Sequence, residues 1–248
     1  MKAIDINTEE KPMNSYRNTA RIAGLLFLAG TVTALPMSYT ESILNAPNYL
    51  TGIAANSTQV LIGALLDFLA AVFSGSIAIS LYPVLKKQNE ALALGAVGLR
   101  LIEAIFYIVN IVGILSLVTL SQDFVRTGAP NASTYYIVGT FIQAARAYAN
   151  FVFGVGTFSL GALTYYIVFY QSRLIPRWLS GWGLLAATLS LAAAILVMFG
   201  LKPLSPFFIV LILPIFFQEI VLEAGSFSRA STRLPSLHCR QNSRNKIT

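Results

Sequence analysis

Four polar side chains lie within a very apolar stretch of the chain, at a spacing that places them on one side of a helix. The stretch reads AVGLRLIEAIFYIVN, residues 96–110, and its polar members are Arg100, Glu103, Tyr107 and Asn110. Because steps of three and four residues return to one helical face, these groups share a face and the opposite face is aliphatic. Arg100 and Glu103 are also close enough to form an ion pair along the helix. This face is therefore predicted to point into a helix bundle.

Three further ionisable residues lie within apolar segments, namely Asp67, Arg146 and Glu219. Asp67 belongs to a stripe of small and polar residues at helical spacing. This stripe is predicted to pack against residues 96–110 across a short antiparallel turn, which places Asp67 beside Asn110.

Estimated depths in the bilayer predict two ionic clusters. In the first, near the inner surface, Arg100 pairs with Glu103 and Glu219. In the second, in the outer half, Asp67 pairs with Arg146.

Three carboxylates against two guanidinium groups leave one carboxyl unmatched. A buried acid of this kind is either protonated or binds a cation, as the titrating groups of proton-coupled transporters do. The plainer interpretation is a neutral Glu103 or Asp67 that hydrogen-bonds Asn110, Tyr107 or a neighbouring carbonyl and serves helix packing.

Patterns typical of enzymes and metal sites are missing from the sequence. There is no phosphate-binding loop, no HExxH and no dinucleotide fingerprint, and the single histidine and cysteine, His238 and Cys239, are adjacent in a polar tail. We therefore predict no catalytic residue, no metal site and no cofactor. Acid/base chemistry by Glu103 and Glu219 on a lipid-linked substrate is conceivable but has no specific support in the spacing.

The elements that position these residues follow from composition. Of the 248 residues, 56% are hydrophobic and 11% are charged, and the mean hydropathy is +0.68, whereas soluble domains carry roughly 25% charged residues. The apolar residues occur in blocks long enough for spanning helices, so the predicted fold class is an all-α polytopic transmembrane helix bundle. The six predicted segments are residues 20–37, 59–84, 92–120, 135–169, 180–200 and 206–224.

Three regions are predicted along the chain. Residues 1–19 form a cytoplasmic N-terminal tail, residues 20–225 the six-helix transmembrane domain, and residues 226–248 a polar, disordered cytoplasmic C-terminal tail. The connections 38–58 and 121–134 are rich in Asn, Pro, Ser, Thr and Gly and are predicted to be external loops.

Basic residues predict the orientation of the domain. Most of the 17 Lys and Arg residues lie in the two tails and in the second-to-third and fourth-to-fifth connections, whereas the opposite side has only Arg126 and Lys202. The positive-inside rule then places both termini in the cytoplasm. We expect a multi-pass protein of the inner or plasma membrane whose partner is the lipid bilayer and not nucleic acid. A homo-oligomer or a membrane-protein partner stays open.

Small residues mark one face of the fourth predicted segment. Ala147, Asn150, Gly154, Thr157 and Gly161 recur at alternating steps of three and four. Such a stripe lets another helix approach closely, so it is predicted to be a packing face.

Several segments together resemble the bacterial six-helix membrane family known as domain of unknown function 4386 (DUF4386). The segments are IAGLLFLAGTV, QVLIGALLDFLAAV, LYPVLKK, LALGAVGLRLIEAIFY, QSRLIPRWLSGWGLL and LPIFFQEI. The resemblance covers roughly residues 17–227 and implies an integral protein of the bacterial plasma membrane. It places Arg100, Glu103 and Glu219 on polar positions of the family, and it implies no activity or ligand.

The function predicted first is therefore a non-enzymatic membrane protein in which the Arg/Glu/Asp cluster fixes helix packing. Two alternatives stay open. One is a small-solute or proton-coupled transporter, and the other is a membrane-embedded enzyme acting on a lipid-linked substrate.

Overall fold

The computed structural model describes residues 24–26, 28–30, 32–33, 37–128 and 132–231. Almost all of these residues are helical, and none of them belongs to a β-strand, so the predicted all-α class is confirmed. The predicted N-terminal tail lies outside the described residues, as does the C-terminal tail from residue 232. The last helix continues to Ser231, so the described chain is still helical where the tail was predicted to begin, at residue 226.

Within the described part of the chain, nine elements follow the helical residues 24–26, 28–30 and 32–33. They are α2 (Met37–Leu44), α3 (Tyr49–Ala55), α4 (Ser57–Leu85), α5 (Glu90–Arg126), α6 (Ala132–Ala147), the π-helical η2 (Tyr148–Gly154), α7 (Val155–Ser172), α8 (Arg177–Met198) and α9 (Pro206–Ser231). α6, η2 and α7 follow one another without a break and form a single long rod. This rod corresponds to the fourth predicted segment, and α9 accommodates Pro214 within its helix.

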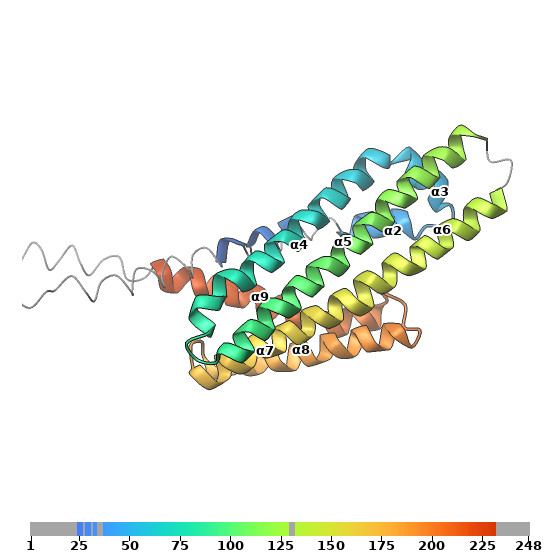
Figure 1. The fold of residues 1–248 in the computed structure, drawn as a ribbon. Coiled ribbons are helices and arrows are strands. Elements are labelled where there is room, and N and C mark those ends of the chain that lie inside the picture. Colours follow the sequence, from blue (N-terminus) through green and yellow to red (C-terminus); the bar gives the residue numbers. More distant parts are fainter. Residues whose placement is uncertain (1–23, 27, 31, 34–36, 129–131, 232–248) are drawn as a thin grey trace, which may run out of the picture.

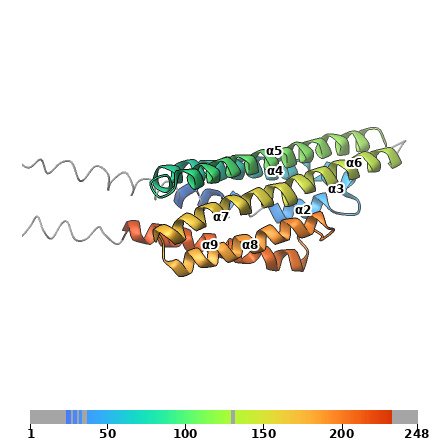
Figure 2. The same ribbon diagram turned by 60° about the horizontal axis from the view of Figure 1, so that its bottom comes forward.

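The long helices run side by side in three layers (Figures 1 and 2). α4 and α5 form an antiparallel hairpin, the α6–η2–α7 rod packs against α5, α8 packs against the rod, and α9 packs against α8. α5 contacts α3, α4, α6, η2 and α7, so it is the central helix of the bundle. The α4–α5 and α7–α8 turns lie at the same end of the bundle as the C-terminal end of α9 (Figure 1).

Four helical stretches within the described residues are long and apolar enough to cross a membrane. They are Ser57–Leu85, Glu90–Arg126, Ala132–Ser172 and Arg177–Met198, and Pro206–Leu222 is a shorter apolar helix. Their outward faces carry bare aliphatic and aromatic side chains, such as Val112, Phe141 and Leu185, which are 57%, 75% and 62% exposed. An apolar exterior around a polar interior is the arrangement that lipid favours.

The prediction of an external loop at residues 38–58 is wrong. This segment forms α2 and α3, which fold back against α4 and α5 (Figure 1). Leu44, Leu50 and Ile53 are completely buried, and Gln143 of α6 donates a hydrogen bond to the carbonyl of Leu44. Burial of these apolar side chains compensates for the many turn-forming residues, which had suggested a loop.

Close packing joins α7 to α8 and α9. Tyr166 of α7 is completely buried, and its hydroxyl donates a hydrogen bond to the side chain of Gln218 in α9. Its ring lies against Gly183 of α8, where a Cβ atom would come within 2.6 Å of the ring carbons. An alanine two residues earlier, at Gly181, would meet nothing within 4 Å. These two glycines therefore differ in packing although they share one helix.

We expect Gly183→Ala to lower the free energy of unfolding by about 1–3 kcal/mol, because the added methyl group overpacks a rigid aromatic contact. Gly181→Ala is the matched control and should leave stability unchanged or raise it by up to about 1 kcal/mol, through better helix propensity. Equilibrium unfolding in mixed micelles measures both values. Equal effects at the two positions would contradict the tight packing of Tyr166 on α8.

Candidate functional site

An ionic cluster centred on Arg100 lies between α4, α5, α7 and α9. The Arg100 guanidinium lies 3.2 Å from the Glu103 carboxylate and 3.6 Å from Glu219 of α9. Arg100 and Glu103 are only 4% and 2% exposed. The predicted first cluster is thus confirmed, including the long-range pairing with Glu219.

Uncharged groups complete the hydrogen bonding of the Arg100 cluster. Arg100 donates to the Ser74 hydroxyl at 3.1 Å, and Ser74 in turn donates to Glu103 at 2.9 Å. Arg100 also donates to the Tyr165 hydroxyl at 3.1 Å, and its guanidinium lies 4.5 Å from the centre of the Phe158 ring. Pairing α4 with α5 across a turn centred on residue 88 predicts Ser76 opposite Arg100, whereas the actual partner is Ser74, two residues away.

A second ionic cluster is centred on Arg146 at the end of α6. Its two terminal nitrogens donate to the two carboxylate oxygens of Glu41 in α2, at 2.7 and 3.0 Å. Asn45 donates to the same carboxylate at 2.8 Å, and Arg146 reaches the Asn110 side-chain oxygen at 3.5 Å. Arg146 and Glu41 are 1% and 4% exposed. A bidentate, fully buried pair of this kind fixes both the distance and the orientation of the two helices.

Gly113 of α5 makes the second cluster possible. A Cβ atom at this position would lie 2.7 Å from the Arg146 Cβ, so only glycine lets α6 approach α5 so closely. Gly154 of the predicted small-residue stripe has the same role further along the rod, because a Cβ there would lie 2.7 Å from the Tyr107 ring. A Cβ at Gly161 would make only ordinary contact, 3.6 Å from the Arg100 side chain.

Glu41, and not the predicted Asp67, is the acid that pairs with Arg146. Glu41 had been assigned to an external loop, whereas α2 brings it into the bundle beside Arg146. One available signal was that Glu41 is the single acidic residue between Lys11 and Asp67. Asp67 makes no ion pair with Arg146 within 4 Å, although the two charges interact at longer range.

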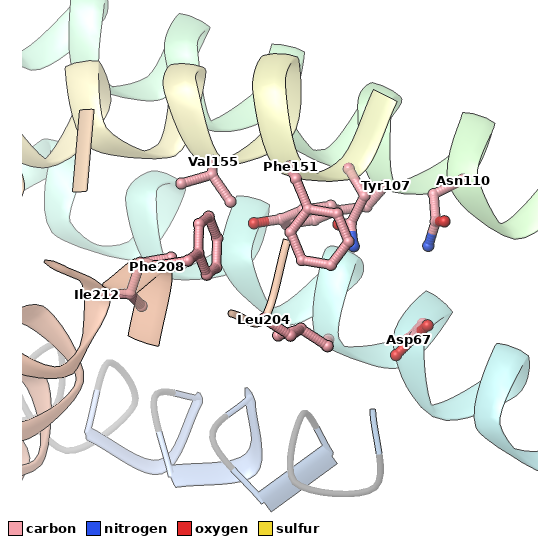
Figure 3. Close-up of a pocket in the computed structure, with 10 residues that line it drawn as sticks. Asp67, Tyr107, Asn110, Phe151, Val155, Leu204, Phe208 and Ile212 are labelled. Atoms are coloured by element: carbon pink, nitrogen blue, oxygen red, sulfur yellow. The ribbon is translucent and has the colours of Figure 1, made fainter. Parts of the chain in front are cut away.

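Asp67 instead lines a cavity of about 280 Å³ (Figure 3). The lining residues come from α4, α5, η2, α7, the α8–α9 turn and α9. They are Asp67, Ala70, Tyr107, Asn110, Asn150, Phe151, Val155, Leu204, Phe208 and Ile212. The predicted neighbours Asp67 and Asn110 are therefore brought together at this cavity. Figure 3 shows them at one end of it, with Ile212 at the other.

The cavity adjoins both clusters. Asn110 accepts a hydrogen bond from Arg146, and the Tyr107 side chain interacts with the Glu103 carboxylate one turn earlier on α5. Asn150 also lines the cavity. It lies on the π-helical turn η2, an irregularity often found at functional sites.

The described interior contains more acidic than basic groups. The carboxyl groups outnumber the guanidinium groups by two. The acids are Glu41, Asp67, Glu103 and Glu219, and the bases are Arg100 and Arg146. No group of three or more His, Cys, Asp or Glu side chains in the described part of the chain could hold a metal ion. Glu103 and Glu219 both pair with Arg100, so the two carboxyls share one cationic neighbour.

Comparison with known proteins gives a family match. The family model described as a domain of unknown function, DUF4386, matches residues 22–223, which include all seven predicted site residues. No curated protein and no solved structure matches the chain.

We expect Glu41→Gln to lower the free energy of unfolding by about 3 kcal/mol, because it leaves the Arg146 guanidinium buried without a counter-charge. Glu90→Gln is the matched control, since Glu90 is exposed at the start of α5, and it should change stability by less than about 0.5 kcal/mol. Equilibrium unfolding in mixed micelles compares the two variants. Equal, small losses would show that α2 does not depend on the Glu41–Arg146 pair.

Proposed function

Because the chain belongs to the DUF4386 family, whose description assigns no activity, we propose a function from its geometry: a multi-pass membrane protein in which two buried ionic clusters fix the packing of the helices. The observation that carries this proposal is the reach of the two guanidinium groups. Arg100 of α5 meets Glu219 of α9, and Arg146 of α6 meets Glu41 of α2. Each pair joins helices that are far apart in the sequence. A buried ion pair offsets the cost of removing its charges from water only when its geometry is good.

The proposed topology has six crossings, with both termini in the cytoplasm of a bacterial cell and the domain in the plasma membrane. Four crossings correspond to the long apolar stretches, and the remaining two would be the first segment predicted from the sequence, residues 20–37, and α9. The end of the bundle that carries the α4–α5 and α7–α8 turns also carries their basic residues, Lys86, Lys87, Arg173 and Arg177. This clustering supports a cytoplasmic position for that end.

The single native cysteine, Cys239, tests the topology. With both termini inside, a membrane-impermeant maleimide should label Cys239 only after the cells are opened. In a Cys239→Ser background, Lys202→Cys places a thiol in the exposed α8–α9 turn, which should be labelled in intact cells. Labelling of Cys239 in intact cells would reverse the orientation.

A second candidate function is transport of a small solute or of protons. The observation that favours it is the cavity, which reaches Tyr107 and through it the Glu103 carboxylate. An intramembrane acid beside a cavity is the usual arrangement of a titrating transport group. For an enzyme acting on a lipid-linked substrate no comparable observation exists among the described residues.

Glu103→Gln separates the packing function from transport. If the cluster serves packing, proteoliposomes of the natural protein and of the variant should both lack proton flux, and the variant should unfold about 5 °C lower, because Arg100 loses its closest counter-charge. Glu90→Gln is again the exposed control. Flux in the natural protein that the variant abolishes would instead identify Glu103 as a transport group.

A further inference from the structure

The cavity contains a carboxylate that the ionic clusters do not use. Asp67 of α4 has no hydrogen bond and no ion pair within 4 Å to any described residue, and both terminal nitrogens of Arg146 donate to Glu41 instead. Asp67 is half-buried and opens onto the cavity (Figure 3). A carboxylate in this position attracts a cation or a strong hydrogen-bond donor.

An independent observation comes from Asn150 of η2, which also lines the cavity. Its side chain is only 2% exposed, and its amide nitrogen has no hydrogen-bond partner among the described residues. A buried amide donor without a partner costs about 1–3 kcal/mol. Because Asn150 lines the cavity, a rotation of its side chain toward the cavity would let an acceptor atom on a bound molecule remove this cost.

The rest of the cavity wall is apolar and partly aromatic. The Phe151 and Phe208 rings meet edge to face with centroids 5.6 Å apart, and Tyr107 adds a third ring. Val155 and Ile212 close the end away from Asp67 (Figure 3). The wall therefore suits a molecule with an apolar body, and its rings suit a positive charge.

We propose that this cavity binds a small protonated organic amine. The ammonium group lies at Asp67, a hydrogen-bond acceptor on the amine faces the Asn150 amide, and the apolar body packs against Phe151 and Phe208. The volume of about 280 Å³ is at the small end of the roughly 300–1,000 Å³ of ligand pockets, so the ligand has few heavy atoms.

An inorganic cation fits the cavity less well than an amine. Metal cations such as Ca²⁺ and Mg²⁺ need about six oxygen ligands, whereas Asp67, Asn110 and Asn150 are the main oxygen donors of a wall that is otherwise apolar. Asn110 already accepts a hydrogen bond from Arg146. Binding of an amine goes beyond the packing function, and if the chain is a transporter it names the class of its solute.

Three probe molecules of similar shape test the proposal with the full chain in nanodiscs of uncharged phosphatidylcholine. The first, 2-phenoxyethylamine, has the ammonium group, an acceptor oxygen and an apolar ring. In 3-phenylpropylamine a methylene replaces the acceptor, and in 2-phenoxyethanol a hydroxyl replaces the ammonium group. Isothermal titration calorimetry measures binding, with empty nanodiscs as the correction for partition into lipid.

We expect saturable binding of 2-phenoxyethylamine. Each of the other two probes should bind at least about 10-fold more weakly. Asp67→Asn should weaken 2-phenoxyethylamine by at least about 10-fold and leave 2-phenoxyethanol unchanged. Asp123→Asn is the matched control, because this carboxylate is exposed at the end of α5 and pairs with Arg126. Asn150→Ala should remove the advantage of 2-phenoxyethylamine over 3-phenylpropylamine.

Ala70→Leu keeps every charge and fills part of the cavity, so it should weaken all three probes even if the Asp67 variant does not fold. The proposal is overturned if the natural protein binds no amine saturably. It is also overturned if 2-phenoxyethanol binds as tightly as the amine, or if a folded Asp67→Asn variant binds the amine unchanged. None of these outcomes bears on the packing function, which is read from the stability of the cluster variants.

Discussion

The cost of placing a guanidinium group in lipid is the constraint on which the rest of this structure depends. Each of the two buried arginines needs a carboxylate and several hydrogen-bond acceptors, since a lone charge in hydrocarbon is expensive. Arg100 obtains them from Glu103, Glu219, Ser74 and Tyr165, which come from four different helices. The same cationic group therefore fixes the rotation and the depth of each of these helices. Apolar contacts alone do this poorly in a membrane.

The same constraint explains why α5 is central and why α2 turns back into the bundle. α5 carries Arg100 and also Gly113, where the backbone of α5 comes close to Arg146. The α6–η2–α7 rod that carries Arg146 contains no acidic residue. α2 therefore supplies Glu41, from a segment whose composition is typical of a loop. α2 and α3 thus cover the end of the bundle away from the α4–α5 turn, and their buried leucines make this return stable.

Between the two clusters the helices separate enough to leave a cavity. Glu41 accepts hydrogen bonds from both terminal nitrogens of Arg146, and Asp67 keeps its carboxylate for the cavity. The π-helical turn contributes Asn150, whose amide nitrogen has no hydrogen-bond partner among the described residues. Excess acid and an unmatched donor are unfavourable in an empty hydrocarbon-like interior. Their presence in one cavity is understandable when the polar groups bind something, and the charge balance favours a cationic molecule.

The sequence by itself determined the all-α class, the polar face of α5 and the Arg100–Glu103–Glu219 cluster, because helical periodicity and depth along apolar helices follow directly from spacing. Only the tertiary structure decided which acid pairs with Arg146. Asp67 and Glu41 carry the same type of charged group, so charge alone does not distinguish them. The partner of Arg146 depends on the path of the chain through α2, and the spacing of residues along one helix does not predict that path. The sequence also did not reveal the cavity or the Asn150 amide, which has no hydrogen-bond partner among the described residues, since both arise where four separate helices meet.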